Sequence, residues 1–126
     1  MKTWSKLWNR SKSPSKQRKF RYNAPLHIRK RFMSASLSKE LRIRYHIRNI
    51  PLRVGDKVKI MVGNNKDKVG KIKLVDLKNY KVKIDGLTRS KTDGSKVELK
   101  FEPSNLMITE LNLDDEKRKK KIERKK

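Results

Sequence analysis

The sequence contains no cysteine and no long run of apolar side chains. Without cysteine there are no disulfides, thiolate metal sites or thiol nucleophiles, which fits a reducing cytosol. The longest run of strongly apolar side chains is three residues, as at residues 60–62, so we expect no membrane span. The first ten residues also lack the apolar stretch of a secretory signal, and we therefore expect a cytoplasmic protein.

Acidic residues are scarce where basic residues are most frequent. The chain has 37 Lys and Arg against 13 Asp and Glu, a net charge of +24, and fifteen of the basic residues lie in the first fifty positions, where Glu40 is the single acid. Lysine and arginine placed against phosphates release counterions, which gives affinity for nucleic acid of any sequence. A membrane-surface helix would need a continuous apolar face or a lipid signal, and neither is evident. The charge therefore favours nucleic acid as the partner.

Only part of the chain has the composition of a packed core, because 40% of its 126 residues are charged and 33% are hydrophobic. We expect residues 1–50 to form a basic N-terminal extension that binds nucleic acid, residues 51–110 a folded β unit, and residues 111–126 a charged C-terminal helix or tail. A unit of about 60 residues is marginal alone. We nevertheless expect it to stay folded, with greatly weakened binding to nucleic acid, when residues 1–50 are removed.

The start of the extension has little to bury. Residues 11–19 contain almost no apolar side chain, so this segment is expected to be extended until an anionic partner holds it. Trp4 and Trp8 are spaced four residues apart. This spacing allows either a short helical turn or two surfaces that stack on bases.

Two short helices are predicted in the rest of the extension. Pro25 suits a first helical turn, and the apolar spacing predicts a basic helix over residues 25–33. Ser36 is the expected N-cap of a second helix. The apolar and aromatic residues at intervals of four in that helix are Leu37, Leu41 and Tyr45.

After Pro51 the apolar period changes to two, which is typical of strands with one buried face. Four alternating segments and a fifth at residues 106–109 predict a mainly β fold, a small SH3-like antiparallel barrel. The alternating residues are Val58, Ile60 and Val62; Ile72 and Leu74; Tyr80, Val82 and Ile84; and Val97, Leu99 and Phe101. The expected core residues, with no binding role, are Val58, Ile60, Ile72, Leu74, Val82 and Ile84.

The C-terminal residues order their charges as a helix dipole favours, acids first and bases last. Asn112 or Asp114 is the expected N-cap. Because Leu113 and Ile122 are the only apolar residues from Asn112 onward, we expect this helix to lie on a partner or to fray.

No catalytic or metal-binding constellation is evident. His27 and His46 have no carboxylate cluster or cysteine near them in the sequence. Gly70 and Lys71 lack the remaining residues of a phosphate-binding loop. The acids Asp56, Asp67, Asp76, Asp85 and Asp93 fall mostly at turn positions. We therefore expect no enzyme activity, cofactor, metal or small-molecule substrate.

Residues 54–72, VGDKVKIMVGNNKDKVGKI, resemble a KOW motif, a strand, a glycine-bearing loop and a strand found in ribosomal and transcription-elongation proteins. The flanking segments carry a more specific resemblance, to the archaeal and eukaryotic family of the universal large-subunit ribosomal protein numbered twenty-four in the bacterial scheme and twenty-six in the eukaryotic one. These segments are PSKQRK at residues 14–19, YNAPLHIRKR at 22–31, MSASLSKELR at 33–42, PSNLMI at 103–108 and DEKRKKKIERK at 115–125.

This resemblance implies a KOW barrel that binds large-subunit ribosomal RNA, early in assembly and near the exit of the polypeptide tunnel. It also implies neighbouring ribosomal proteins as partners and a cytoplasmic, ribosome-bound location, and we expect no homo-oligomer. The family commonly has Arg-Gly before the KOW loop and Lys-Gly within it, whereas this chain has Val62-Gly63 and Lys66-Asp67. Asp67 places a negative charge where glycine would allow a phosphate to approach closely.

We expect the basic extension and the loop at residues 63–68 to contact RNA. Phe20 and Tyr22 have two open readings, stacking on bases or local packing. The predicted RNA-binding residues are Lys16, Arg18, Lys19, Phe20, Arg21, Tyr22, Arg29, Lys30, Arg31, Lys39, Arg42, Arg44, Arg48, Arg53, Asn64, Asn65, Lys66 and Lys68.

Two other functions remain as alternatives. A KOW module of the transcription elongation machinery would bind polymerase or emerging RNA, but that class usually joins its barrel to another globular domain. A nonspecific DNA-compacting protein would bind duplex DNA and structured RNA equally. Co-sedimentation with large ribosomal subunits rather than with polymerase separates the first alternative. Competition between duplex DNA and structured RNA at several salt concentrations separates the second.

Overall fold

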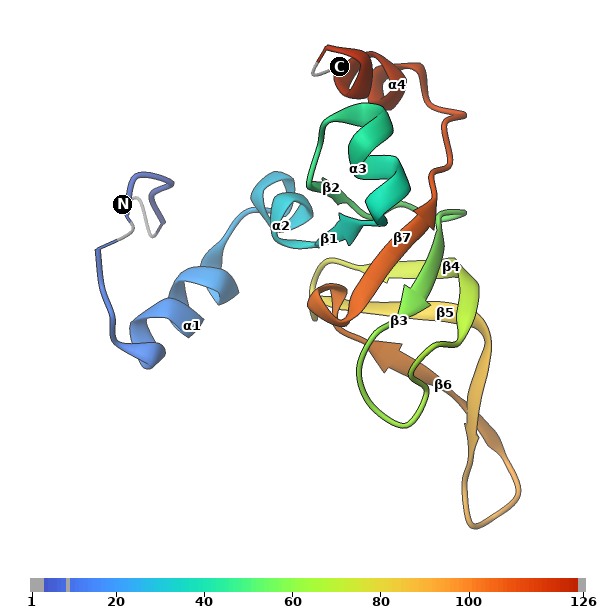
Figure 1. The fold of residues 1–126 in the computed structure, drawn as a ribbon. Coiled ribbons are helices and arrows are strands. Elements are labelled where there is room, and N and C mark those ends of the chain that lie inside the picture. Colours follow the sequence, from blue (N-terminus) through green and yellow to red (C-terminus); the bar gives the residue numbers. More distant parts are fainter. Residues whose placement is uncertain (1–3, 9, 125–126) are drawn as a thin grey trace.

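The computed structural model describes residues 4–8 and 10–124, and its elements follow the change of period along the sequence (Figure 1). Helices lie mainly before residue 46 and at the C-terminal end, whereas strands fill the region between. The helices are α1 (Pro14–Asn23), α2 (Leu26–Phe32), α3 (Lys39–Tyr45), the 3₁₀ helix η1 (Pro103–Asn105) and α4 (Glu116–Glu123). The strands are β1 (Ser34–Leu37), β2 (Asn49–Pro51), β3 (Lys57–Ile60), β4 (Val69–Asp76), β5 (Lys81–Ser90), β6 (Lys96–Phe101) and β7 (Leu106–Glu110).

The strands of the described residues form one seven-stranded sheet in the order β2-β1-β7-β3-β4-β5-β6. The five strands expected from the period-two segments are β3 to β7, and they pair with one another in antiparallel fashion. β4, β5 and β6 run across the direction of β3 and β7, so the sheet is strongly bent (Figure 1). Within the described ranges β2 and β6 do not pair with each other, so hydrogen bonds do not close the sheet into a full circle. The mainly β class is confirmed.

The sheet extends into the segment that we expected to lie outside it. β1 pairs antiparallel with β2 and parallel with β7, and its alternation turns Ala35 and Leu37 into the core. The expected N-cap at Ser36 is therefore wrong, because Ser36 lies within β1. The helix starts later, and the hydroxyl of Ser38 caps α3 by accepting a hydrogen bond from the Leu41 amide at 3.5 Å.

Residues 11–19 are not extended throughout, as the sequence had led us to expect, because α1 begins at Pro14. Pro14 suits the first helical turn, and the ring of Phe20 stacks with the indoles of Trp4 and Trp8 at centroid distances of 4.9 and 5.2 Å. These aromatic contacts offset an ordering cost that residues 11–19 could not offset by themselves. The helix predicted over residues 25–33 is confirmed as α2.

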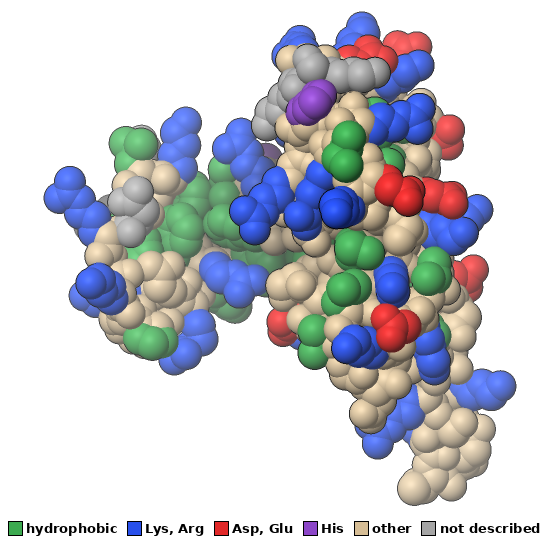
Figure 2. Space-filling model, in the orientation of Figure 1, with side chains coloured by type: hydrophobic (Ala, Val, Ile, Leu, Met, Phe, Trp, Pro, Cys, Tyr) green, Lys and Arg blue, Asp and Glu red, His purple; other side chains and the backbone are tan. Residues whose placement is uncertain are grey.

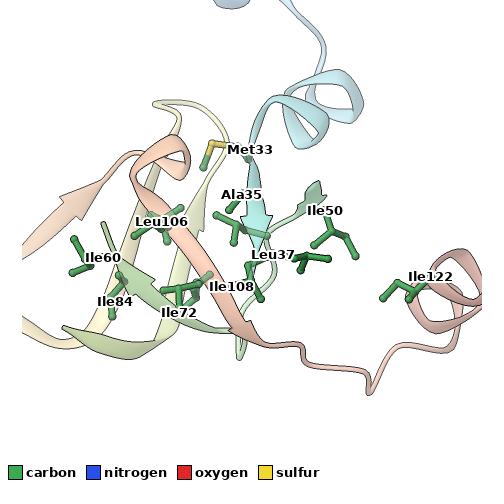
Figure 3. Packing of buried hydrophobic residues seen from close by; sticks show 13 residues of the cluster. Met33, Ala35, Leu37, Ile50, Ile60, Ile72, Ile84, Leu106, Ile108 and Ile122 are labelled. Carbon is green, nitrogen blue, oxygen red and sulfur yellow. The ribbon is translucent and has the colours of Figure 1, made fainter. Parts of the chain in front are cut away.

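A single apolar cluster joins the sheet, β1 and α4 (Figure 3). Five of the six predicted core residues belong to it, but Leu74 is 46% exposed and the prediction for this residue is wrong. The register between β4 and β5 shifts between Ile72 and Leu74. As a result Val75, and not Leu74, lies opposite the buried Val82. Val62 is also exposed, in the loop after β3. The cluster comprises Met33, Ala35, Leu37, Ile50, Leu52, Val58, Ile60, Ile72, Val82, Ile84, Leu106, Ile108 and Ile122.

The C-terminal helix packs on the chain's own core. Ile122 is buried in the apolar cluster, and Arg118 is buried beside it on the same helix. The expected cap is wrong, since the carboxylate of Asp115 accepts the Lys117 amide at 3.2 Å and caps α4. The expectation of a fraying or partner-bound helix is corrected in the same way, because Ile122 and Arg118, four residues apart, form a face that the rest of the chain covers.

Candidate nucleic-acid interface

The ion pairs of the described residues all lie in the part of the chain that follows the extension, in strands, in the turns between them, and in α4 with its N-cap. All seven join residues between positions 53 and 118, and none includes a Lys or Arg of the extension from Arg10 to Arg48. The carboxylates of the sheet thus face lysines of the sheet, and the extension keeps its positive charge. The pairs are Arg53–Asp115, Lys57–Glu110, Lys59–Asp67, Lys73–Glu98, Lys81–Glu102, Lys83–Glu98 and Arg118–Asp56.

α1 presents four predicted contact residues to solvent. It has no buried residue, and Figure 1 shows it projecting away from the sheet. The guanidinium carbon of Arg21 lies 4.5 Å from the ring centroid of Tyr80, and the Tyr80 hydroxyl donates to the Arg21 carbonyl. Arg18 and Arg21 also line a hollow of about 440 Å³ between α1 and the β4–β5 turn. The four exposed residues are Lys16, Arg18, Lys19 and Arg21.

Phe20 and Tyr22, for which the sequence allowed either base stacking or local packing, have different surroundings in the structure. Phe20 is half-buried, stacks with both tryptophans, and lies 6.1 Å from Phe32 between ring centroids. Local packing therefore explains Phe20. Tyr22 is 77% exposed, so its ring remains open to a stacking partner.

Arg29 differs from the other predicted contacts because its side chain is half-buried and binds backbone. Its Nε donates to the Ala24 carbonyl at 2.8 Å, and one terminal nitrogen donates to the Lys78 carbonyl at 3.0 Å. The other terminal nitrogen donates to the Tyr22 carbonyl. Arg29 thus ties the α1–α2 junction to the turn between β4 and β5, and a guanidinium with five donors has capacity left for only a limited further contact.

Further predicted residues lie on and beside α3. Arg42 donates through Nε to the Leu37 carbonyl at 2.9 Å, which orients the side chain along β1. Arg42 and Arg48 line one hollow of about 320 Å³ together with His46. The predicted residues Arg31, Lys39, Arg42, Arg44 and Arg48 are all exposed.

The structure brings together three basic residues that are distant in sequence. Lys30 is exposed, but partial desolvation, followed by the positive charges of Arg53 and Lys121, lowers its pKa below the ordinary value, while the Asp115 carboxylate acts in the opposite direction. Arg53 is half-buried and pairs with Asp115. Lys121 on α4 was missed by the sequence analysis, and the only available signal was the basic second half of that helix. This group of like charges is suited to an anion.

The KOW loop is exposed at most of its positions. Asp67 has φ of 70°, a left-handed conformation that favours glycine, which explains the family's usual residue there. Its carboxylate lies 3.5 Å from the Lys59 ammonium, so its charge is partly compensated within the chain. The Lys68 ammonium donates to the Asn65 side-chain oxygen at 2.9 Å. Asn64, Lys66 and Lys68 are exposed and Asn65 is half-buried.

The described part of the chain holds no group of three or more His, Cys, Asp or Glu side chains arranged for a metal ion. Across residues 4–8 and 10–124, no helix is both long enough and apolar enough to cross a bilayer. The fold and the surface define a class, that of a small β-sheet protein with a basic helical extension whose charges, among the residues described, form no ion pairs.

The comparisons with known proteins agree on one family. Residues 11–125 match the family model that describes the ribosomal proteins L26 of eukaryotes and their archaeal counterparts. Two relatives named large ribosomal subunit protein uL24 come from Korarchaeum cryptofilum, 47% identical over 92% of this chain and 88% of the relative, and Methanosphaera stadtmanae, 48% identical over 91% and 98%. A third uL24, from Methanothrix thermoacetophila, is 48% identical over 87% of this chain and 95% of its own.

The chain therefore belongs to this family of ribosomal proteins, eukaryotic L26 and archaeal uL24, and the family resemblance of its KOW and flanking segments is confirmed. Proteins of this family are structural components of the ribosome, so the chain is not an enzyme. The match begins at residue 11, which leaves Trp4 and Trp8 outside it. The first ten residues, whose role the sequence left open, are described except for residues 1–3 and 9.

Proposed function

We propose that the protein is a structural constituent of the large ribosomal subunit and binds large-subunit ribosomal RNA through its basic extension. One observation carries the RNA-binding part of this proposal. The seven ion pairs of the described residues lie between positions 53 and 118, so the carboxylates offset only charges of the sheet region and α4 and leave those of the extension uncompensated.

The extension suits structured RNA for reasons of charge and shape. Each basic group that replaces a counterion at a phosphate adds affinity that falls with salt. Arginine adds geometry, because its planar guanidinium can bind two phosphate oxygens at once. An α-helix with its side chains is about 10–12 Å wide, so α1 can enter between RNA helices where the sheet is too broad. Such contacts fix position, and the folded shape of the RNA supplies specificity.

The remaining basic groups support a continuous binding face. Figure 2 shows Lys and Arg side chains gathered where the extension joins the body of the molecule. The charges of Arg53 and Lys121 act on the pKa of Lys30, and Arg42 and Arg48 share the hollow beside α3. We expect phosphates at both places. The role of the KOW loop in RNA binding stays a prediction, supported by the exposure of Asn64 and Lys66.

The finer parts of the proposal depend on the family. By resemblance, the protein binds early in subunit assembly, near the exit of the polypeptide tunnel and beside other ribosomal proteins. Its location is then cytoplasmic and ribosome-bound. The uL24 relatives are named as proteins of the large subunit, which favours this reading over the transcription-elongation alternative.

Co-sedimentation with large subunits in moderate salt tests the proposal. The full chain is expected to sediment with the subunit, and a variant with Lys16, Arg18, Lys19 and Arg21 changed to Gln is expected to dissociate as salt is raised. The control variant removes the same charge from Lys57, Lys73, Lys81 and Lys83, which have acidic partners, and it should be retained. Association with RNA polymerase alone, or equal affinity for duplex DNA and ribosomal RNA, would contradict the proposal.

A further inference from the structure

Trp4 and Trp8 form an aromatic cluster on α1. The Trp4 indole Nε1 donates to the Phe20 carbonyl at 2.9 Å, and both indoles stack with the Phe20 ring, at interplanar angles of 26° and 29°. The two tryptophans remain half-buried, so part of each indole is open to solvent. They also lie before residue 11, where the family match begins.

The cluster borders a groove of about 430 Å³. Its walls combine the aromatic side chains of Trp4, Trp8 and Phe20 with the basic side chains of Lys16 and Lys19. The amide of Asn23 completes the lining and can both donate and accept hydrogen bonds. Flat aromatic surface, positive charge and an amide therefore meet in one place.

We propose that this groove binds one unstacked nucleotide of RNA, with the base stacked on an exposed indole and the adjoining phosphates at Lys16 and Lys19. The inference rests on the proposed function and adds a base-binding site to it. Stacking on an aromatic side chain tolerates any base, because every base has a π face. An apolar side chain of a protein would use the aromatic walls but would desolvate two lysines without compensation. The charge of the groove therefore favours a nucleotide.

The groove is held in place before any ligand binds. Phe20 lies 6.1 Å from Phe32, and Phe32 lies 6.2 Å from Tyr80, between ring centroids. This row of rings leads from the groove to the start of β5, and Figure 2 shows hydrophobic side chains along the junction between the N-terminal lobe and the body. A preformed site loses less conformational entropy when it binds.

Intrinsic fluorescence tests the proposal directly, because Trp4 and Trp8 are the two tryptophans of the chain. The full-length protein is titrated with 5′-labelled hexauridylate or hexaadenylate, and with a labelled abasic phosphodiester of equal length. Anisotropy of the label reports all binding, whereas tryptophan quenching reports the groove. We expect the two RNA hexamers to quench the fluorescence and the abasic chain to bind more weakly with little quenching.

Two sets of variants refine the test. Trp8→Ala should weaken binding of the RNA hexamers roughly tenfold to a hundredfold, in the range of one base stack, and leave binding of the abasic chain unchanged. Replacing Lys16 and Lys19 by Gln should lower the salt dependence of log Kd by about 0.7 for each phosphate that is no longer bound. The matched control replaces Lys6 and Lys12 by Gln, which removes the same charge from two residues that do not line the groove. Leu7 is 81% exposed, so Leu7→Ala serves as the control for Trp8→Ala, because it shortens a neighbouring apolar side chain of the same segment.

Each outcome has a definite meaning. Equal quenching by the abasic chain, or binding without quenching, overturns the nucleotide site and leaves the proposed function standing. A tryptophan spectral shift that occurs only with another ribosomal protein also overturns it, in favour of a protein contact. Absence of any binding by anisotropy also overturns the nucleotide site, whereas the proposed function is decided by co-sedimentation with large subunits. Because the abasic comparison uses the unmodified chain, the test holds even where Trp8→Ala unfolds α1, which circular dichroism would reveal.

Discussion

Arg118 and Asp56 form a buried ion pair in which two guanidinium nitrogens each lie 2.6 Å from a carboxylate oxygen. The side chains are 3% and 0% exposed. Asp56 also accepts the backbone amides of Arg53 at 3.0 Å and Asn112 at 2.8 Å. The pair therefore fastens α4 to the turn before β3, across most of the second half of the chain.

Arg118→Met should lower the free energy of unfolding by about 3–5 kcal/mol, because it leaves a buried carboxylate without its counter-charge. Asp56→Asn should cost a similar amount, and the double variant less than the sum of the two, because the residues act together. Urea unfolding followed by circular dichroism measures all three. The control is Arg53→Met, whose partner Asp115 is 35% exposed, and a loss of at most about 1 kcal/mol is expected there. A loss equally small for Arg118→Met would rule out the structural role of the buried pair.

This pair shows where inference from the sequence stops. Asp56 stands in a turn-like segment, and a turn role was a reasonable expectation from its neighbours alone. Arg118 was one base among many in residues 112–126, where only Leu113 and Ile122 are apolar. Their pairing depends on the path of the chain between them, which local periodicity does not encode. Period two does identify β3 to β7, because alternation depends on neighbours within each strand.

The core prediction can be tested with two leucines. Leu37→Ala should lower the free energy of unfolding by about 2–5 kcal/mol because it leaves a cavity in the apolar cluster. Leu74→Ala should change it by less than about 0.5 kcal/mol, because Leu74 is largely on the surface. Chemical denaturation of both variants provides the measurement. A loss for Leu74→Ala as large as that for Leu37→Ala would contradict the exposed position of Leu74.

The comparison of Leu37 with Leu74 also shows which core residues can be predicted from the sequence. Alternation predicted the inward face of β3 and β5, but one irregular residue in β4 turned Leu74 outward. Leu37 was read as helical because it stands four residues before Leu41, although the alternation of residues 34–37 equally fits a strand. Pairing with β2 and β7 decided between the two, and those partners are distant in sequence.

Truncation distinguishes the helical extension from the strands that follow it. Removal of residues 1–23 should leave the sheet folded, because α1 has no buried residue. Removal of residues 1–50 should unfold the protein, because it deletes β1 and nearly all of β2 and exposes Leu106 and Ile108 on β7. From the sequence we expected the chain without residues 1–50 to stay folded, whereas the strand pairing predicts that it unfolds. Circular dichroism with thermal melting decides the matter, and a cooperative melt of the shorter fragment lacking residues 1–50 would contradict the assignment.

Glu98 should give the protein part of its acid sensitivity. Hydrogen bonds from Lys73, and then Lys83, hold the pKa of Glu98 below its ordinary value of 4.5. A carboxylate with a lowered pKa stabilises the fold above its unfolded pKa, and the contribution is lost as the pH falls through its folded pKa. Glu98→Gln should therefore flatten the dependence of unfolding free energy on pH below about 4.5. Urea midpoints between neutral pH and about pH 3 test this, with Glu110→Gln as the control. Parallel curves for Glu98→Gln and the unmodified protein would exclude the contribution.

Lys121 should belong to the RNA-binding surface although the sequence did not predict it. The charge of Lys121 helps to lower the pKa of Lys30. Lys121→Gln should therefore raise the pKa of Lys30 toward its ordinary value, and NMR titration of the Lys30 side chain measures this change. If the group of like charges holds a phosphate, Lys121→Gln should weaken binding to ribosomal RNA and reduce the slope of log Kd against log salt by up to about one. Lys73→Gln removes the same charge from a lysine paired with Glu98 and should leave the slope unchanged. Equal slopes for both variants would confine the interface to the N-terminal extension, whereas the expected difference would show that α4, held in place by the buried Arg118, contributes to it.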